Sequence, residues 1–464
     1  MPLNISNLDL LVFVILTIVT LFYTVILCKR RKEKNTVDYL LFGRRLTLPL
    51  FVATLVSTWY GDVFGVTQIA FERGISTIVV YGIGFYVAAI FFMIFVVEKA
   101  RKIYTFTLPE IIEKYYGKTS AKIASLMIMI KALPVTYLIG IGLLIQKLFS
   151  LNLYFAMLVG LIFVVTYMGI RGFQSIVYSD IIQFVLMYFS VIMVVVFSFT
   201  TYGDYSFLMS HLDNQYFVID GYETLSELFM WFFISIITTF MSPIFYQRCF
   251  AAKSVKVAKS GIIISVIFWM ICDFCTVIGS MYAKVILPNS LTHEAYFNYA
   301  LEILPVGFKG IFLSGIAATI LSTLDSFLFV CSSTLIYDLM GNKLINNNFH
   351  KTFGLITVSI ITFFVAGYFI DSIDKFYILI KSYCGVTLAV PLILTILFGK
   401  ILKEMQFIMS ISLSCMCMIV NDFILSEPLA KSFYIGASIC FLNVCVFTIF
   451  NYLCRIGFSE RYAS

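Results

Sequence analysis

Residues 310–340 read GIFLSGIAATILSTLDSFLFVCSSTLIYDLM, an apolar segment that is long enough to cross a bilayer. Four hydroxyl side chains interrupt it at spacings of i, i+3, i+4 and i+7, namely Thr319, Ser322, Thr323 and Ser326. A helix places residues at this spacing on one face, and Asp325 lies beside them. Hydroxyl and carboxylate oxygens are ligands that small, hard cations prefer, and a carboxylate at membrane depth usually faces a partner or a water-filled path. The segment therefore predicts a helix that lines an ion path.

The same hydroxyl groups have a purely structural interpretation. Serine and threonine in membrane helices often donate to a carbonyl of the preceding turn, and small side chains let two helices pack closely. The stripe alone leaves both interpretations open, so the rest of the chain has to decide between them.

The composition places the chain among polytopic membrane proteins. Of its 464 residues, 61% are hydrophobic and 12% are charged, and the mean hydropathy of +0.98 is far above that of ordinary soluble domains. We therefore expect a single all-α transmembrane domain over residues 1–464, embedded in the lipid bilayer. Apolar runs of about 20 residues predict about thirteen spanning helices, at 8–28, 48–70, 75–97, 122–146, 152–170, 177–200, 227–246, 261–287, 309–338, 353–370, 375–398, 406–423 and 432–454.

The distribution of charge predicts how the chain is oriented. Basic residues cluster after the first, third and seventh predicted helices, at Lys29, Arg30, Arg31, Lys32, Lys34, Arg44 and Arg45, at Lys99, Arg101, Lys102, Lys114, Lys118 and Lys122, and at Arg248, Lys253, Lys256 and Lys259. Cytoplasmic loops carry such an excess, whereas the loop at 201–226 has acidic residues and no Lys or Arg. We expect an outside N-terminus and a cytoplasmic C-terminus in the plasma (inner) membrane.

Two further expectations follow from these charges. The net charge of +7 is explained by the loops, so we predict no nucleic-acid partner. The helix at 8–28 lacks a basic start and a small-residue cleavage site, and its basic cluster comes after it. It is therefore expected to stay as an anchor rather than to be removed as a signal peptide.

Other classes of function find little support. Cys272 and Cys275 have CxxC spacing, but they lie in an apolar helix, and the three histidines all fall in predicted loops. A transition-metal or redox site is therefore not expected. The chain has no phosphate-binding glycine loop and no nucleophile elbow. We predict neither an enzyme nor an ATP-driven pump, and no cofactor beyond a coupling ion.

Two predicted helices carry an interruption. The helix at 48–70 contains the polar, glycine-marked stretch 56–65, VSTWYGDVFG, and the helix at 227–246 contains Ser235 and the pair Ser242-Pro243. These helices open two successive groups of five, at 48–200 and 227–398, with one leading helix and two trailing helices at 406–454. Paired interruptions of this kind are typical of leucine-transporter-like carriers, in which two inverted repeats enclose a site at the membrane midplane.

Several short stretches, in order, resemble the sodium:solute symporter family. Residues 38–45, DYLLFGRR, resemble its DYFLAGR motif, TLPE at 107–110 with YG at 116–117 resembles the loop after its second core helix, and QR at 247–248 with AAKS at 251–254 resembles its QR..AAKS loop. Residues 315–338 resemble its ion-helix signature. The similarity runs from about Asp38 to about Gly385. It implies a leucine-transporter-like 5+5 inverted repeat and sodium-driven uptake of a small solute.

The resemblance also implies a sodium site. Carried over by position, its ligands are the hydroxyls of Ser322 and Thr323 and the backbone carbonyls of Leu55, Thr58 and Thr319. Relatives carry alanine where this chain has Thr319, but a carbonyl ligand does not depend on the side chain.

A second ionic position is implied by the resemblance at Asp180. Its context, YSDIIQ at 178–183, resembles the WTDVIQ motif, whose aspartate is associated with sodium passage or with a second sodium ion. Asp325 is a further candidate for that role. The structural alternative is that Asp180 caps a helix end near the membrane surface.

The substrate side departs from the family pattern. Asp62 and Lys381 fall where a sugar-transporting member presents glutamines, and Lys131, Asp273 and Ser235 are further polar groups inside predicted spans. Opposite charges across one cavity favour a charged or zwitterionic solute over a sugar, because unpaired charges are expensive at that depth. The alternatives are lysines that snorkel to the interface, a permanent ion pair between Asp62 and Lys381, or Asp273 as a structural partner for Lys131 or Lys381.

These observations predict a sodium-coupled secondary symporter that imports a small polar metabolite by alternating access. A proton-coupled carrier of the same fold would use Asp180 or Asp325 as its titrating group. A sensor that binds a solute without transporting it would share the same core. The partners expected in all three cases are a small-molecule solute and the lipid bilayer. The sodium-coupled symporter also binds sodium as its coupling ion.

Overall fold

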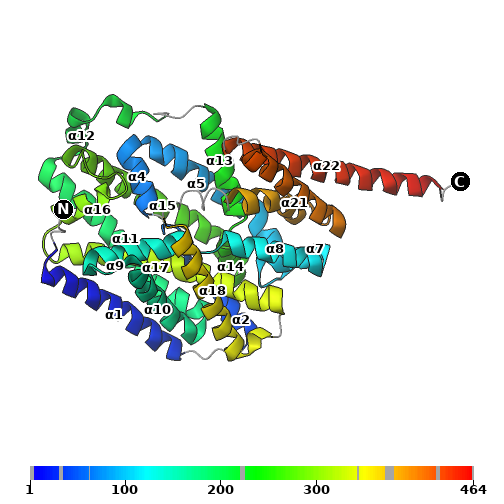
Figure 1. Cartoon of the computed structure of the whole chain (residues 1–464), viewed down its shortest axis with the longest axis horizontal. Coiled ribbons are helices and arrows are strands. Elements are labelled where there is room, and N and C mark those ends of the chain that lie inside the picture. Colours follow the sequence, from blue (N-terminus) through cyan, green and yellow to red (C-terminus); the bar gives the residue numbers. More distant parts are fainter. Residues whose placement is uncertain are drawn as a thin grey trace.

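The structure is a computed structural model that describes residues 5–30, 35–61, 63–219, 225–341, 344–370, 381–424 and 429–461. Within these ranges the regular secondary structure is helical, apart from one isolated backbone bridge between Leu46 and Ala252. The helices form one bundle, from which the end of α22 (Leu429–Arg461) projects (Figure 1). The predicted all-α architecture is confirmed.

The described helices follow the order that the hydropathy pattern predicts. The leading helix is α1 (Asn7–Arg30). The first group contains α3 (Leu48–Ser57), α4 (Val63–Arg73), the continuous run from Ile78 to Ile103, α8 (Lys118–Lys131), α9 (Val135–Phe149), α10 (Leu153–Arg171) and α11 (Phe173–Tyr202). The second contains α13 (Leu225–Phe240), α14 (Pro243–Ala251), α15 (Val255–Ile286), α17 (Phe308–Ser333), α18 (Asn348–Tyr368) and α20 (Thr387–Phe398), followed by α21 (Glu404–Ile419) and α22.

Among the described residues, nine helices are long and apolar enough to cross a membrane, or ten if the bent pair α13 and α14 is one span. Three shorter apolar helices, at 48–57, 153–169 and 383–398, fall at the other predicted positions. The start of the span expected at 375–398 lies outside the described residues. The number of crossings and the repeat boundaries at 48–200 and 227–398 stay predictions.

Both expected interruptions are present. Helix α3 ends at Ser57, and residues 58–61 are not helical before α4 begins at Val63. Helices α13 and α14 meet at a bend of 44°, where Pro243 starts the second helix. A further break, which we did not predict, separates α8 from α9 just before Val135. Its cause is Pro134, which has no backbone N–H and clashes with the preceding turn.

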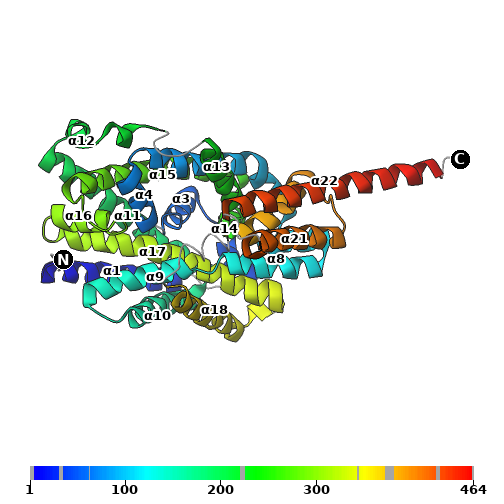
Figure 2. The same ribbon diagram turned by 45° about the horizontal axis from the view of Figure 1, so that its top comes forward.

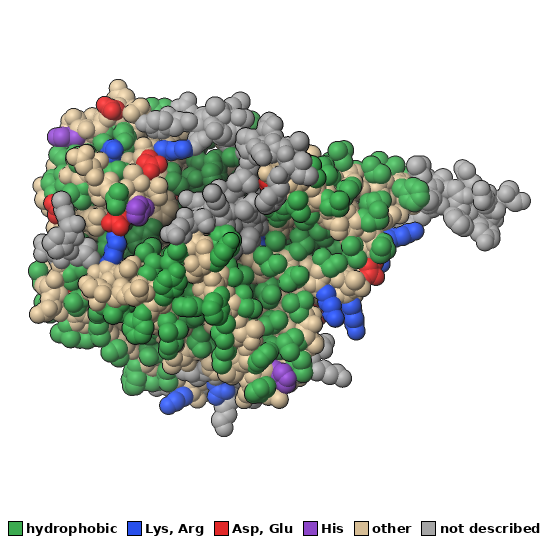
Figure 3. All heavy atoms as spheres, in the orientation of Figure 1, with side chains coloured by type: hydrophobic (Ala, Val, Ile, Leu, Met, Phe, Trp, Pro, Cys, Tyr) green, Lys and Arg blue, Asp and Glu red, His purple; other side chains and the backbone are tan. Residues whose placement is uncertain are grey.

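Helix α17 runs through the middle of the bundle (Figure 2). It packs against α1, α3, α9, α11 and α18, and it is buried along nearly its whole length. The peripheral helices expose large apolar side chains instead, among them Phe22 of α1, Ile162 of α10 and Phe364 of α18. On the face shown in Figure 3, hydrophobic side chains cover most of the lower central part, and charged side chains gather at the upper left and along the lower and right edges. This arrangement suits a protein surrounded by lipid, with α17 as its interior axis.

Candidate cation site and broken helices

The end of α3 meets the hydroxyl stripe of α17. The Thr323 hydroxyl lies 3.1 Å from the carbonyl oxygen of Thr58 and 3.1 Å from that of Thr319. A helix leaves the carbonyls of its last turn without helical donors, so the interruption after Ser57 makes such oxygens available beside α17. Gly61 makes the approach possible, because a Cβ at this position would lie 2.5 Å from the Cβ of Thr323.

The four stripe residues have different roles. Thr319 donates its hydroxyl to the carbonyl of Gly315 at 2.7 Å, in the preceding turn of its own helix. Its hydroxyl thus follows the structural alternative, while its carbonyl faces Thr323. The hydroxyls of Ser322 and Ser326 point to other helices instead. The stripe is therefore a helix–helix contact at three of its four positions.

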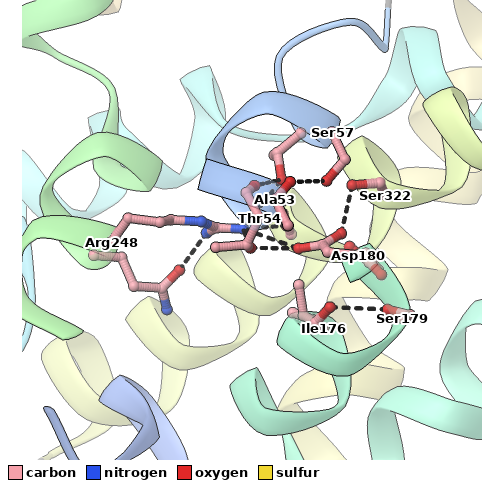
Figure 4. A network of polar contacts seen from close by, with 12 residues as sticks. Ala53, Thr54, Ser57, Ile176, Ser179, Asp180, Arg248 and Ser322 are labelled. Atoms are coloured by element: carbon pink, nitrogen blue, oxygen red, sulfur yellow. Dashed lines mark hydrogen bonds and ion pairs between the residues drawn. The ribbon is translucent and has the colours of Figure 1, made fainter. Parts of the chain in front are cut away.

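Asp180 accepts hydrogen bonds from one stripe hydroxyl and from one hydroxyl of α3. Ser322 donates to one carboxylate oxygen at 2.6 Å, and Thr54 of α3 donates to the other. Figure 4 shows Asp180 between these residues. Asp180 is completely buried and lies in the third turn of α11, which begins at Phe173. The alternative that Asp180 caps a helix end near the surface is therefore wrong.

Arg248 is the residue that sequence reasoning misplaced. We counted it among cytoplasmic loop charges, but it lies within α14 and its side chain is fully buried. One of its nitrogens, Nη2, donates to the Ser326 hydroxyl at 2.7 Å and to the Thr54 and Thr58 hydroxyls at 3.2 Å. The same nitrogen is 4.0 Å from an Asp180 oxygen (Figure 4). The guanidinium thus connects α14 with α3, α11 and α17.

Arg248 could have been found from the sequence. Pro243 is a favourable first residue for a new helix. This signal predicts that a helix resumes after the break and that Arg248 belongs to that helix, α14, rather than to a loop. The positive-inside rule counts lysine and arginine near helix ends without separating loop residues from those inside a resumed helix.

Asp325 adds a second buried carboxylate to this cluster. It accepts a hydrogen bond of 2.6 Å from the Tyr167 hydroxyl of α10, while its other oxygen has no partner among the described residues. With both aspartates ionised, the cluster of Asp180, Asp325 and Arg248 has one more negative than positive charge. Buried charge of this kind is costly unless it is compensated. A bound cation or a proton would provide the compensation.

Hydrogen bonds join the segment before α3 to α14 and the residues that follow it. Backbone hydrogen bonds join Leu46 to Ala251 at 3.0 Å and Lys253 to Leu46 at 2.9 Å, and Gln247 donates to the carbonyl of Leu40 at 3.3 Å. A cavity beside Leu40 and Gln247 has a volume of about 20 Å³, room for about one water molecule. A solute could not pass here without a movement of these segments.

The two residues that we expected to face each other across the substrate cavity are not both described. Asp62 and the side chain of Lys381 lie outside the described residues, so their relation stays a prediction. Lys131, at the end of α8, donates to the carbonyl of Met241 at 3.3 Å, in the break between α13 and α14. Ser235 donates to the carbonyl of Trp231 in its own helix at 2.8 Å. These contacts do not test a role of either side chain in substrate binding, which stays a prediction.

Asp273 has partners that the sequence did not suggest. Its two carboxylate oxygens accept hydrogen bonds from the hydroxyls of Tyr60, in the interruption after α3, and Tyr86 of α5 (Gly84–Phe91). Lys131 is engaged with Met241 instead. The alternative of a permanent ion pair between Asp273 and Lys131 is therefore wrong.

Comparison with known proteins identifies the group to which the chain is related. The model of the sodium:solute symporter family matches residues 39–404. The chain belongs to the sodium:solute symporter family. This confirms the resemblance carried by the motifs at 38–45, 107–117 and 247–254, and it supports sodium-coupled symport. It also indicates a multi-pass membrane protein of a transporter family, with sodium implied as the coupling ion.

The curated relatives of this family are distant. A sodium/glucose cotransporter of Vibrio parahaemolyticus is 24% identical over 70% of this chain and 67% of its own length. Solute carrier family 5 member 4B of Mus musculus is 22% identical over 65% of this chain, and the match covers 54% of the mouse protein. The chain thus spans about half the length of the mouse relative and two thirds of that of the bacterial one.

Solved structures share the fold. A Na⁺-coupled sialic acid symporter in a substrate-bound outward-open state has a TM-score of 0.80 at 15% identity, covering 96% of this chain and 98% of that one. A nucleobase-cation-symport-1 family transporter in a closed conformation has a TM-score of 0.63 at 11% identity, covering 91% and 96%. At such identities the likeness concerns the fold alone, and it confirms the predicted leucine-transporter-like architecture.

Proposed function

We propose that this protein is a sodium-coupled symporter that imports a small polar solute, charged or zwitterionic, by alternating access. The observation that carries the proposal is the meeting of a broken helix with a hydroxyl-bearing one, where the Thr323 hydroxyl lies 3.1 Å from the Thr58 carbonyl. Broken helices supply carbonyl oxygens for coupling ions at the midplane of such transporters.

The proposed sodium ligands are the carbonyls of Leu55, Thr58 and Thr319 and the hydroxyls of Ser322 and Thr323. A sodium ion here would join the end of α3 to α17 more strongly than the Thr323 hydrogen bond does. Sodium would thereby favour the conformation in which these two helices are in contact. A difference in sodium affinity between two conformations is the thermodynamic requirement for coupling.

Asp180 and Asp325 are proposed to serve sodium exit or a second sodium ion. Both carboxylates lie on elements that border the first site, since Asp180 accepts the Ser322 hydroxyl and Asp325 is in α17. The negative charge left over after Arg248 is counted would attract a cation that leaves the main site.

The same excess charge supports a second candidate, a proton-coupled carrier in which Asp180 or Asp325 binds the proton. Neutralisation of one carboxylate would balance the cluster against Arg248 without any metal ion. A sensor that binds solute without moving it has the same core, and only a flux measurement separates it from a carrier.

The test is uptake by proteoliposomes that contain the full-length protein, with a panel of labelled amino acids, amines, organic acids and sugars. Each solute is offered under an inward sodium gradient, under an inward proton gradient, and under neither. We expect sodium alone to drive the accumulation of one solute class. Accumulation driven by the proton gradient alone would replace sodium coupling with the second candidate. Sodium-dependent binding without accumulation would indicate a sensor.

The zwitterion hypothesis for Asp62 and Lys381 has its own test. Asp62→Asn and Lys381→Gln are each expected to abolish uptake of an amino-acid-like solute, and the charge-swapped double variant should not restore it. Restoration by the swap would point to a structural ion pair.

A further inference from the structure

Asp273 lies in an unusual electrostatic setting. It is a carboxylate in the long apolar helix α15, and among the described residues no lysine, arginine or histidine forms an ion pair with it. Its known partners, Tyr60 and Tyr86, donate hydrogen bonds but carry no charge. A carboxylate at membrane depth is costly without a cationic partner. This contrasts with Asp180, which has Arg248 nearby.

The position of Asp273 is built by three separate parts of the chain. Tyr60 belongs to the interruption after α3, and it also lies 2.7 Å from the carbonyl of Trp269. Tyr86 comes from α5, directly after the π-helical turn η2 (Ile78–Ile83). Gly82 in that turn leaves space for the contact between Tyr86 and Asp273, because a Cβ at Gly82 would lie 2.9 Å from the Tyr86 hydroxyl and 3.3 Å from an Asp273 carboxylate oxygen. π-Helical turns of this kind occur frequently at functional sites.

A cluster of aromatic rings begins one helical turn before Asp273, at Trp269. Trp269 is one helical turn before Asp273, so both side chains leave α15 on one face. Trp59 stacks on Trp269 with ring centres 4.9 Å apart and contacts Phe85 at 5.2 Å and Phe245 at 5.3 Å. Trp59, Phe85 and Asp273 each keep part of their surface accessible, whereas Tyr60 and Tyr86 are buried. Aromatic faces attract cations, so rings and carboxylate favour the same kind of ligand.

We propose that Asp273, held by the hydroxyls of Tyr60 and Tyr86, binds the protonated amine of the transported solute next to the aromatic cluster of Trp59 and Trp269. The amine would supply the positive charge that the described surroundings of Asp273 lack, and its N–H groups would donate to the carboxylate oxygens. The proposal rests on the proposed symport function and names the substrate class as amines, amino acids included.

The location also connects the solute with the ion. Tyr60, which contacts Asp273, is two residues from Thr58, which contacts α17. Both contacts belong to the interruption at 58–61, so an amine at Asp273 and a sodium ion at α17 would each favour one arrangement of the same short segment. Sodium should therefore raise the affinity for the amine, and the amine should raise the affinity for sodium by the same factor.

The test measures thermal unfolding of the purified full-length protein with matched ligands, in sodium and in choline-free potassium buffer. The probes are pairs that differ at the amine only: free amino acids with their N-acetyl derivatives, and tyramine with its alcohol analogue tyrosol. We expect at least one protonated amine to raise the Tm in sodium while its partner without the ammonium group does not. Stabilisation by neutral or acidic members only, or by none of the amines, overturns the proposal without any variant being needed.

Asp273→Asn sharpens the result. It keeps the shape of the side chain and should lower the affinity for the stabilising amine about 100-fold, the effect of truncating one partner of a buried charge pair. Asp338→Asn is the matched control, because Asp338 also accepts a hydroxyl hydrogen bond, 2.6 Å from Thr107, but is far from α15 in the sequence and has no proposed role. Unchanged amine affinity in Asp273→Asn overturns the proposal. Sodium-driven uptake of an amine-free sugar would also overturn it, together with the charged or zwitterionic solute, while leaving sodium-coupled symport intact.

Discussion

The two sides of the interruption at residues 58–61 differ in how a carboxylate inside the bundle is compensated. On the side of α3, Thr54 and Thr58 face Asp180 and the guanidinium of Arg248, so charges and hydroxyl groups balance one another. On the side of α4, Tyr60 faces Asp273 among aromatic rings, without a basic partner among the described residues. Under our proposals the first side binds an ion and the second an organic solute, and the segment 58–61 connects the two sides.

The largest effect is expected when Arg248 is replaced. Arg248→Gln removes the cation from a buried cluster with two carboxylates, so it should lower the free energy of unfolding by about 3–5 kcal/mol, as expected when one partner of a buried pair is removed. Adding Asp180→Asn should recover a large part of that loss. Thermal unfolding of the single and double variants measures both. An Arg248→Gln protein as stable as the wild type would show that the charge of Arg248 does not stabilise the buried carboxylates on the α3 side.

A second prediction separates the two sides functionally. Asp180→Asn should slow uptake by about 10- to 100-fold through loss of one charge partner, yet leave solute binding nearly unchanged, because Asp180 contacts the ion side only. Asp180→Glu should restore part of the rate. Uptake kinetics and solute affinity are measured on the same preparations. Equal losses of binding and uptake would assign Asp180 a structural role.

A third prediction concerns the close approach at Gly61. Gly61→Ala places a Cβ 2.5 Å from the Cβ of Thr323, so α3 and α17 must separate slightly. An overpacking cost of about 1.4 kcal/mol that falls on the sodium-bound contact should lower the apparent sodium affinity about tenfold. Gly169→Ala is the control, since a Cβ there meets no atom within 4 Å. Sodium titrations of uptake compare the two variants. Equal sodium dependence in both would mean that the contact is not part of the ion site.

The smallest effect is expected at Thr319. Its hydroxyl only donates to the Gly315 carbonyl of its own helix, and the proposed ligand is its carbonyl. Thr319→Ala should therefore change the sodium dependence of uptake by less than about twofold, within the range of substitutions that disturb no special feature. A large shift would place the hydroxyl, rather than the backbone, among the sodium ligands.

The sequence predicted the fold well because lipid imposes a simple rule. Each span must be helical and apolar, so runs of hydrophobic residues locate α1, α11 and α15, and polar or proline residues locate the breaks after Ser57 and before Pro243. The break before Val135 was missed because we did not treat Pro134 as an interruption, although a proline within a helical pattern ends or kinks the helix.

The candidate site was only partly predictable. The spacing within α17 indicated which hydroxyls share a face, but not that Thr319 would use its own for the preceding turn. Ionisable groups were found easily, whereas their partners were not: Asp273 meets two tyrosines rather than Lys131, and Arg248 enters the interior. Partners depend on the packing of helices distant in sequence, and hydropathy carries no information about that.

The most direct test of the central claim is equilibrium binding of radioactive sodium to the purified protein. Ser322→Ala combined with Thr323→Val removes both proposed hydroxyl ligands, and Ser314→Ala is the control, since Ser314 donates only to the Gly310 carbonyl of the same helix. We predict saturable sodium binding to the wild type and to Ser314→Ala, and a large loss of affinity in the double variant. Unchanged sodium binding by the double variant would contradict a sodium site between α3 and α17.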